Sequence, residues 1–128
     1  MNVVTGAFGY TGKYIARRLL DLGETVTTLT GNPGRANEFG PAVKVVPFRF
    51  EEPEAMAASL TGARILYNTY WVRFDRRDAT HDRAVSNTIA LIRAAKMAGV
   101  QRIVHISITN PDVNSDLQIG RASCRERV

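Results

Sequence analysis

Three glycines near the N-terminus have the spacing that a bound pyrophosphate requires. The segment from Thr5 to Gly12 reads Thr-Gly-Ala-Phe-Gly-Tyr-Thr-Gly and follows the short apolar stretch 1–4. One glycine permits a tight turn, the next lets backbone approach the phosphates, and the last lets a helix pack closely on the strand. N–H groups at the start of that helix then point at the phosphates. An ordinary strand-to-helix turn is the alternative. The residues of the predicted dinucleotide-binding turn are Gly6, Phe8, Gly9, Tyr10, Thr11 and Gly12.

The end of the second expected strand bears on which dinucleotide would bind. An Asp or Glu at this point would bind the 2′-hydroxyl of the adenosine ribose and repel a 2′-phosphate. This sequence has Thr30, Asn32 and Arg35 there and no acid between them. The segment therefore favours NADP over NAD. Binding of NAD, with Arg35 as a solvated surface side chain, is the alternative.

Runs of β-branched residues alternate with helical patterns along the chain. This alternation predicts an α/β fold of the Rossmann type, a doubly wound parallel sheet with strand order 3-2-1-4-5 that is truncated after strand five. Ligands would bind beyond the carboxyl ends, where strands 1 and 4 diverge. The expected strands are 1–5, 24–30, 43–46, 65–69 and 102–107, and the expected helices are 13–22, 54–60 and 80–98.

Two of the expected helices carry apolar residues at helical spacing. Such a stripe predicts the face that packs on the sheet. The inward residues would be Ile15, Leu19 and Leu22 in the first helix, and Val85, Ile89 and Ile92 in the longest one.

Three segments together resemble the extended and atypical short-chain dehydrogenase/reductases, in particular the epimerase/dehydratase-type and NmrA-like NAD(P)-binding proteins. They are Val-Thr-Gly-Ala-Phe-Gly-Tyr-Thr-Gly, Leu-Thr-Gly-Asn-Pro, and Ala-Ala-Lys-Met-Ala-Gly-Val-Gln-Arg-Ile-Val-His-Ile-Ser, within residues 1–112. The resemblance implies that Asn68, Thr69 and Tyr70 line the ribose on the nicotinamide side. It also implies that Asn87 lies beneath the site and that Ser107 is the family's active-site Ser/Thr.

The sequence departs from the family at two places. The family's Asp-Leu pair after strand three, which contacts the adenine, is replaced by Arg49-Phe50. Phe50 would still supply an apolar wall, and Arg49 would reach the adenine or a phosphate. The family's Tyr-x-x-x-Lys pair, its general acid/base and the Lys that lowers the Tyr pKa, does not occur in this sequence.

Without that pair the chain is expected to bind cofactor without turning substrate over. Ser107 and Thr109 are comparable candidates to hold a substrate oxygen, and a polar residue that merely ends a strand is the alternative for Ser107. The leading interpretation is the NAD(P)-binding part of a short-chain-type oxidoreductase or epimerase that acts on a small molecule. A non-catalytic, NmrA-like NADP sensor and a structural dinucleotide-binding subunit are the alternatives.

Composition narrows the functional classes further. The net charge is +5, but the only local basic run, Arg73 with Arg76 and Arg77, is interrupted by Asp75 and Asp78, so a solvated loop is favoured over a nucleic-acid surface. The absence of a membrane-length apolar stretch or signal peptide, with the single Cys124, predicts a cytoplasmic protein. His81 is expected to pack or to cap its helix rather than to act as a catalyst, and His105 is expected to pack because its strand should be buried. No pair of His, Cys or carboxylate residues has metal-ligand spacing, so a metal site is not expected. Trp71 and Phe74 would wall a substrate pocket or simply pack.

The last ten residues, 119–128, resemble the in-frame translation of a short sequencing adapter. We therefore expect residues 1–118 to form an incomplete domain and the natural sequence to diverge near Gln118, a genuine basic tail being the alternative. Strand five would then be an uncovered edge with an apolar face, a surface prone to association.

Overall fold

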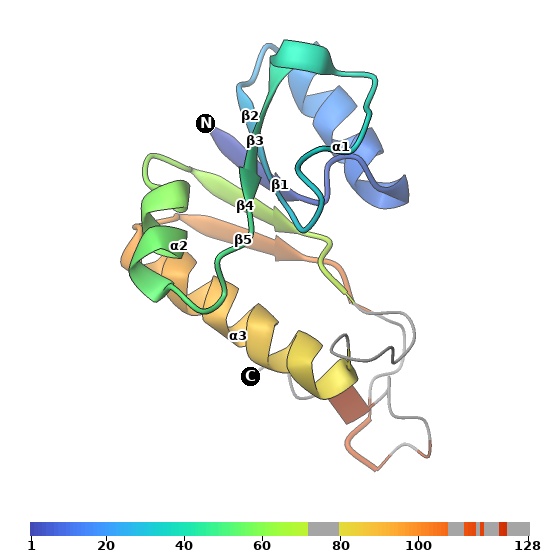
Figure 1. The fold of residues 1–128 in the computed structure, drawn as a ribbon, viewed down its shortest axis with the longest axis vertical. Coiled ribbons are helices and arrows are strands. Elements are labelled where there is room, and N and C mark those ends of the chain that lie inside the picture. Colours follow the sequence, from blue (N-terminus) through green and yellow to red (C-terminus); the bar gives the residue numbers. More distant parts are fainter. Residues whose placement is uncertain (72–79, 108–111, 115, 117–120, 123–128) are drawn as a thin grey trace.

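Five parallel strands form one sheet in the order β3-β2-β1-β4-β5 (Figure 1). This is the strand order that the alternating sequence pattern predicts. The computed structural model describes residues 1–71, 80–107, 112–114, 116 and 121–122. The strands are β1 (Asn2–Thr5), β2 (Val26–Thr30), β3 (Val43–Pro47), β4 (Ile65–Asn68) and β5 (Arg102–His105). The predicted residues outside the described part are Arg73, Phe74, Arg76, Arg77, Thr109, Gln118 and Cys124.

Helices cover both faces of the sheet. Helix α1 lies on one face, and α2 and α3 lie together on the other (Figure 1). Helix α1 joins the neighbouring strands β1 and β2, and α3 joins the neighbouring strands β4 and β5, as βαβ units do, whereas α2 leads from β3 across the sheet to β4. The helices are α1 (Tyr10–Asp21), α2 (Pro53–Leu60) and α3 (His81–Met97), with a short 3₁₀ helix η1 at Gly40–Ala42.

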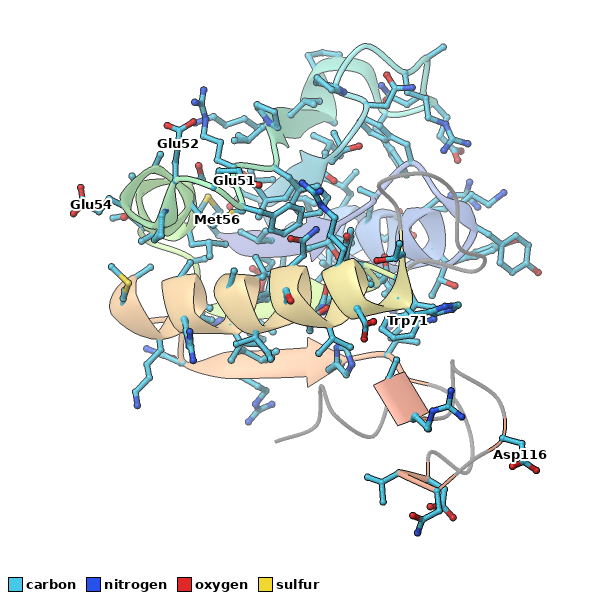
Figure 2. The ribbon with its side chains drawn as sticks, turned by 60° about the horizontal axis from the view of Figure 1, so that its bottom comes forward. Glu51, Glu52, Glu54, Met56, Trp71 and Asp116 are labelled. Atoms are coloured by element: carbon cyan, nitrogen blue, oxygen red, sulfur yellow. The ribbon has the colours of Figure 1, made fainter. Side chains whose placement is uncertain are left out.

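Two apolar clusters lie on the two faces of the sheet. Val4 of β1 packs with Ala16 and Leu19 of α1. Its neighbour Val3 points the opposite way and packs with Met56 of α2 and with residues of α3. Figure 2 shows Met56 on the inward side of α2. The central strand β1 is therefore buried on both faces, which agrees with its continuous apolar sequence.

Helix α1 begins three residues earlier than predicted. Gly9 is its N-cap, with an extended backbone (φ −84°, ψ 177°), so the helix starts within the glycine segment itself. The prediction that Leu22 faces the sheet is wrong, because Leu22 is the C-cap and is 60% exposed. It lies beyond the last helical turn, where the 3.6-residue period no longer sets the direction of a side chain. Gly23 follows with φ +76°, the left-handed conformation that ends a helix.

The inner face of α3 is rotated slightly from the predicted stripe. Val85 is buried as expected, whereas Ile89 and Ile92 are half-buried. The most buried line runs mainly through residues with small side chains, which let the helix approach α2 and the sheet closely. Its members are Ala84, Thr88, Leu91, Ala94 and Ala95.

Strand β5 is an edge strand with one open face. Val104 and Ile106 are 39% and 43% exposed, whereas Ile103 and His105 on the opposite face are half-buried. Helix α1 packs on β1, β2 and β3, so its cover does not extend to β5. The prediction of an apolar edge face is confirmed, and the expectation that β5 is buried holds for one face only.

Candidate functional site

The glycine segment forms a tight turn between β1 and α1. Gly6 adopts a φ of +63° and donates its N–H to the carbonyl oxygen of Leu29, at 2.8 Å. Gly9 donates to the carbonyl oxygen of Gly6, at 2.9 Å. A Cβ on Gly12 would lie 2.0 Å from that same oxygen, so no other residue fits there without moving the backbone. The tight turn at Gly6 and the close helix contact at Gly12 agree with the roles that their spacing predicts, and the approach of a phosphate to Gly9 stays a prediction.

The N-terminus of α1 is open to an anion. Its N-cap Gly9 offers no side chain to bind the first N–H groups, and the first turn carries no acidic residue. The first N–H groups of a helix have no partner within the helix, and the helix dipole adds partial positive charge there. Tyr10 and Thr11 supply two of these N–H groups. This end of α1 can therefore hold a phosphate.

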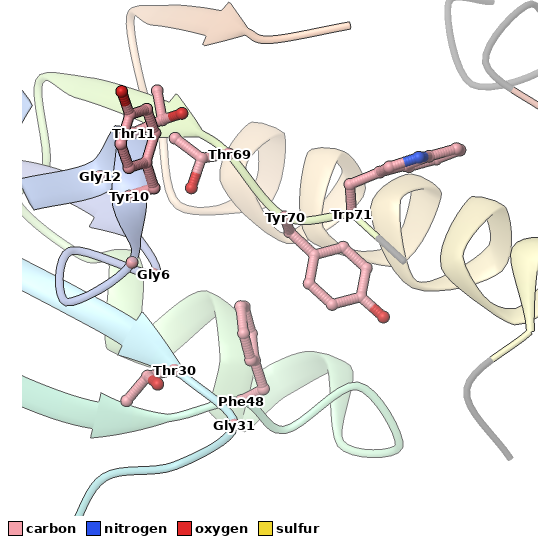
Figure 3. Close-up of a pocket in the computed structure, with 11 residues that line it drawn as sticks. Gly6, Tyr10, Thr11, Gly12, Thr30, Gly31, Phe48, Thr69, Tyr70 and Trp71 are labelled. Carbon is pink, nitrogen blue, oxygen red and sulfur yellow. The ribbon is translucent and has the colours of Figure 1, made fainter. Parts of the chain in front are cut away.

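A cleft of about 360 Å³ lies at the carboxyl ends of the strands, in front of this turn. Figure 3 shows the glycine turn on one side of it, Thr30 with Phe48 on another, and Tyr70 on a third. It lies where β1 and β4 diverge, which is where doubly wound sheets bind ligands. Its lining residues are Gly6, Gly9, Tyr10, Thr11, Gly12, Thr30, Gly31, Phe48, Thr69, Tyr70 and Trp71.

Three aromatic rings form the wall opposite the glycine turn. Phe48 stacks on Phe50, with centroids 4.6 Å apart, and each ring lies 5.3 Å from Tyr70. Asn87 of α3 donates from Nδ2 to the Tyr70 hydroxyl oxygen, at 2.9 Å. Asn87 therefore lies behind the wall, as the family resemblance implies, and Phe50 supports the wall from behind Phe48. Sequence reasoning missed Phe48, although its position directly after β3 brings it to the ligand-binding edge.

Asn68 lies behind the cleft rather than on its surface. Its side chain is fully buried, and its Oδ1 accepts hydrogen bonds from the Thr5 hydroxyl and the Tyr70 N–H, both at 3.0 Å. The Thr69 N–H donates to the Thr5 Oγ1 at 2.7 Å. Of the three residues predicted to line the ribose, Thr69 and Tyr70 line the cleft, whereas Asn68 holds the backbone that carries them.

The segment after β2 forms one exposed border of the cleft. Thr30 lines it, and its Oγ1 accepts the N–H of Asn32 at 3.1 Å. Arg35 is exposed and makes no ion pair with any residue that the structure describes. Arg49 is not on the cleft. It pairs with Glu52 at 3.4 Å beside a separate surface hollow of about 440 Å³, so its predicted reach to adenine would require that pair to open.

The remaining candidates, Ser107, His105, His81 and Phe8, are not among the residues that line the cleft. Ser107, just past β5, has a buried Oγ without a hydrogen-bond partner among the described residues. His105 contacts the amide nitrogen of Asn68 through Nδ1, at 3.0 Å. His81 is buried, and its ring packs 5.9 Å from that of Trp71, the packing role that the sequence predicts. Phe8 faces away from the cleft and stacks on Phe39 at 6.3 Å.

These features fit a dinucleotide. The open helix end and the Cβ-free backbone at Gly9 and Gly12 suit a pyrophosphate, and the flat Phe48 ring suits a planar base. Among residues 1–71, 80–107 and the few described beyond them, no three His, Cys, Asp or Glu side chains gather as metal ligands would. In the same part of the chain, no helix has the length and apolarity to cross a bilayer.

A family model described as NAD(P)H-binding matches residues 6–122, nearly the whole chain. The chain belongs to this NAD(P)H-binding family. The match begins at the first glycine of the turn and includes every residue that lines the cleft. The resemblance to short-chain dehydrogenase/reductases and epimerases is confirmed at the level of the family.

Curated relatives of this NAD(P)H-binding chain carry different names. The chain is 29% identical over 126 residues to the photosystem II assembly factor Ycf39 of Guillardia theta, covering 96% of this chain and 40% of that protein. It is 31% identical over 118 residues to the UDP-glucose 4-epimerase of Mycolicibacterium smegmatis, covering 83% and 38%. The chain thus spans about two fifths of the length of the curated relatives it matches.

Solved structures share its fold at low sequence identity. Triphenylmethane reductase of Citrobacter sp. superposes with a TM-score of 0.79 at 18% identity, covering 99% of this chain and 44% of that one. A nucleoside-diphosphate-sugar epimerase of Staphylococcus aureus gives a TM-score of 0.77 at 18% identity, covering 99% and 45%. Members of this structural group have been solved with NADP(H) and with NAD.

Proposed function

We propose that this chain is the nucleotide-binding part of an NAD(P)(H)-dependent oxidoreductase or epimerase that acts on a small molecule. The observation that carries the proposal is the pairing of an uncapped helix N-terminus with a turn in which Gly12 has no room for a Cβ. A pyrophosphate is the ligand that this combination suits. The match to the NAD(P)H-binding family supports the same ligand.

Different residues around the cleft would contact different parts of the dinucleotide. The N–H groups of Tyr10 and Thr11 would hold the pyrophosphate, and Phe48 would cover the adenosine side. Thr69 and Tyr70 would border the ribose on the nicotinamide side. When bound, the nicotinamide supplies or accepts hydride, and the protein orients it and excludes water.

Substrate would enter near the end of β5. The buried Oγ of Ser107 has no partner among the described residues, so it would be available to hold a substrate oxygen. The comparable candidate, Thr109, lies outside the described residues. Proton transfer would require an acid-base pair, and no Tyr-x-x-x-Lys occurs within residues 1–128. We therefore expect nucleotide binding from this sequence and no turnover.

A non-catalytic nucleotide-binding protein is the second candidate. Two curated relatives are named photosystem II assembly factors, at 29% and 30% identity, and neither name describes a reaction. An NADP sensor or a structural subunit would use the same cleft without an acid-base pair. A cytoplasmic protein, as the composition predicts, fits either candidate.

We further propose that the cleft prefers NADP. Residues 30–35 contain no acid that would repel a 2′-phosphate, and Arg35 is exposed and closely follows Thr30 and Gly31, which line the cleft. A guanidinium binds a phosphate through charge-assisted hydrogen bonds. NADP(H) and NAD both occur in solved structures of similar fold, so the preference rests on this segment alone.

The proposal is tested by titrating NADPH and NADH into the protein while its fluorescence is followed. Trp71 is the only tryptophan and lines the cleft, so its emission reports on a bound nicotinamide. The informative variant is Tyr10→Pro, which removes the first N–H of α1. Proline is favoured at this helix position, and Gly9 before it already has the extended backbone that proline demands.

We expect Tyr10→Pro to weaken NADPH binding about tenfold, since it deletes one charge-assisted hydrogen bond. The matched control is Tyr10→Ala, which removes the ring but keeps the N–H and should bind nearly as the parent does. Absence of binding by the parent protein would reject the proposed function. Equal affinity of the proline and alanine variants would reject the role of the α1 N-terminus.

A further inference from the structure

A line of hydrogen bonds crosses three strands behind the cleft. His105 of β5 contacts Asn68 of β4, with 3.0 Å between Nδ1 and Nδ2. The other end of the Asn68 amide, Oδ1, accepts from Thr5 of β1 and from the backbone N–H of Tyr70, each at 3.0 Å. The line thus joins the edge strand to the two strands that flank the cleft.

The hydrogen-bond donors around Asn68 allow only one orientation of its amide oxygen and nitrogen. The backbone N–H of Tyr70 can only donate, so the Asn68 atom facing it must be the oxygen. The Thr5 Oγ1 already accepts from the Thr69 N–H at 2.7 Å, so its own hydrogen is directed to the same oxygen. The amide nitrogen of Asn68 therefore faces His105.

This arrangement determines the tautomer of His105. An amide NH₂ donates and cannot accept, so the Nδ1 that faces it must carry no hydrogen. The neutral ring then holds its hydrogen on Nε2. Asn68 is fully buried, and a buried amide that lost this partner would remain unsatisfied.

We propose that His105 is a positioning residue for the dinucleotide cleft: in its Nε2–H tautomer it locks Asn68, which holds the side-chain hydroxyl of Thr5 and the backbone N–H of Tyr70 beside the cleft. The effect on nucleotide affinity rests on the proposed function, whereas the lock itself does not. Thr69 belongs to the same unit, because its hydroxyl donates to the carbonyl oxygen of Thr5. Loss of the lock would loosen one wall of the cleft without removing any group that contacts the nucleotide.

The tautomer can be measured on the full chain without nucleotide. The ¹⁵N chemical shifts of His105 should show an unprotonated Nδ1 and a protonated Nε2 at neutral pH. In Asn68→Asp, a carboxylate oxygen faces Nδ1 and requires a hydrogen there, so the Nδ1 signal should move to the protonated range. A protonated Nδ1 in the parent protein, or no change in Asn68→Asp, would overturn the lock.

Two substitutions of His105 separate the effect of its hydrogen-bond acceptor from the effect of its side-chain volume. His105→Leu removes the acceptor, and we expect faster hydrogen exchange at the Tyr70 N–H and an NADPH affinity about two- to tenfold lower. His105→Asn puts an oxygen where Nδ1 stands and should restore both readings towards the parent values. The control is Ile103→Val, which trims the same face of β5 and leaves the line of hydrogen bonds intact.

The readings distinguish the two proposals. If the parent protein binds no nucleotide, the proposed function fails, and the tautomer and the Tyr70 exchange still decide whether the lock exists. If the parent binds NADPH but His105→Leu changes neither the hydrogen exchange at the Tyr70 N–H nor the NADPH affinity, the positioning role is wrong. If Ile103→Val or His105→Asn is impaired as strongly as His105→Leu, the effect is one of general stability, and the inference is rejected.

Discussion

The carbonyl oxygen of Gly6 occupies the space that a side chain on Gly12 would need. A Cβ placed on Gly12 would lie 2.0 Å from this oxygen and 2.7 Å from the carbonyl carbon. These atoms belong to backbone, which cannot turn aside as a flexible side chain can. The contact joins the first turn of α1 to the end of β1, and it thereby aims the helix N-terminus at the cleft.

Gly12→Ala is therefore expected to destabilise the fold by about 3 kcal/mol, the upper range for overpacking. Thermal unfolding followed by circular dichroism measures the loss. Gly31→Ala is the matched control, because Gly31 also lines the cleft but has no atom within 4 Å of the point that its Cβ would occupy and no positive φ. Comparable melting temperatures for the two variants would contradict the packing argument.

Arg35 is expected to determine the preference between the two dinucleotides. Arg35→Ala should weaken NADPH binding about five- to tenfold and leave NADH binding nearly unchanged, because only NADPH carries the 2′-phosphate. The difference should shrink as salt is added, since Arg35 is exposed. Titration of both nucleotides at two ionic strengths measures it.

The control for Arg35 is Arg18→Ala. Arg18 is also an exposed arginine, but it lies in the last turn of α1, at the end away from the glycine turn. Its removal changes the net charge equally and should leave both affinities unaltered. A parallel loss of NADPH and NADH affinity in Arg35→Ala would mean that Arg35 supports the loop rather than recognising the 2′-phosphate.

The hydrogen bond between Asn87 and Tyr70 is expected to contribute to stability. Tyr70→Phe removes the hydroxyl that accepts from Asn87 Nδ2, leaving a half-buried amide unsatisfied. The ring contacts with Phe48 and Phe50 remain available to the phenylalanine. A double-mutant cycle with Asn87→Ala should give a coupling of about 1 kcal/mol in the free energy of unfolding. Additive effects in urea denaturation would show that the pair is not coupled.

The sequence predicts the scaffold well because the relevant signals are local. The alternation of strands and helices predicts the order 3-2-1-4-5, and the glycine spacing predicts the turn, with no knowledge of distant contacts. The prediction for Leu22 is wrong because the direction of this side chain depends on where α1 ends, which a periodic pattern does not specify.

The wall of the cleft could be predicted only in part, because it depends on contacts between separate strands. The resemblance places Asn68 on the ribose, yet its buried position follows from the alternation of β4 and from partners on β1 and β5. Phe48 was missed because its neighbour Phe50 matches the family position that contacts adenine. Which of two nearby rings lines the cleft is decided by the path of the chain after β3.

The exposed face of β5 is expected to make the 128-residue chain associate. Val104 and Ile106 present apolar side chains, at 39% and 43% exposed, on an edge strand, and such edges recruit other chains. Replacing both by lysine should raise the monomer fraction in light scattering, because charged edges resist pairing. Met97→Lys is the control, since Met97 is 62% exposed but lies on α3. A monodisperse monomer of the parent chain, or equal improvement by Met97→Lys, would show that this face does not drive association.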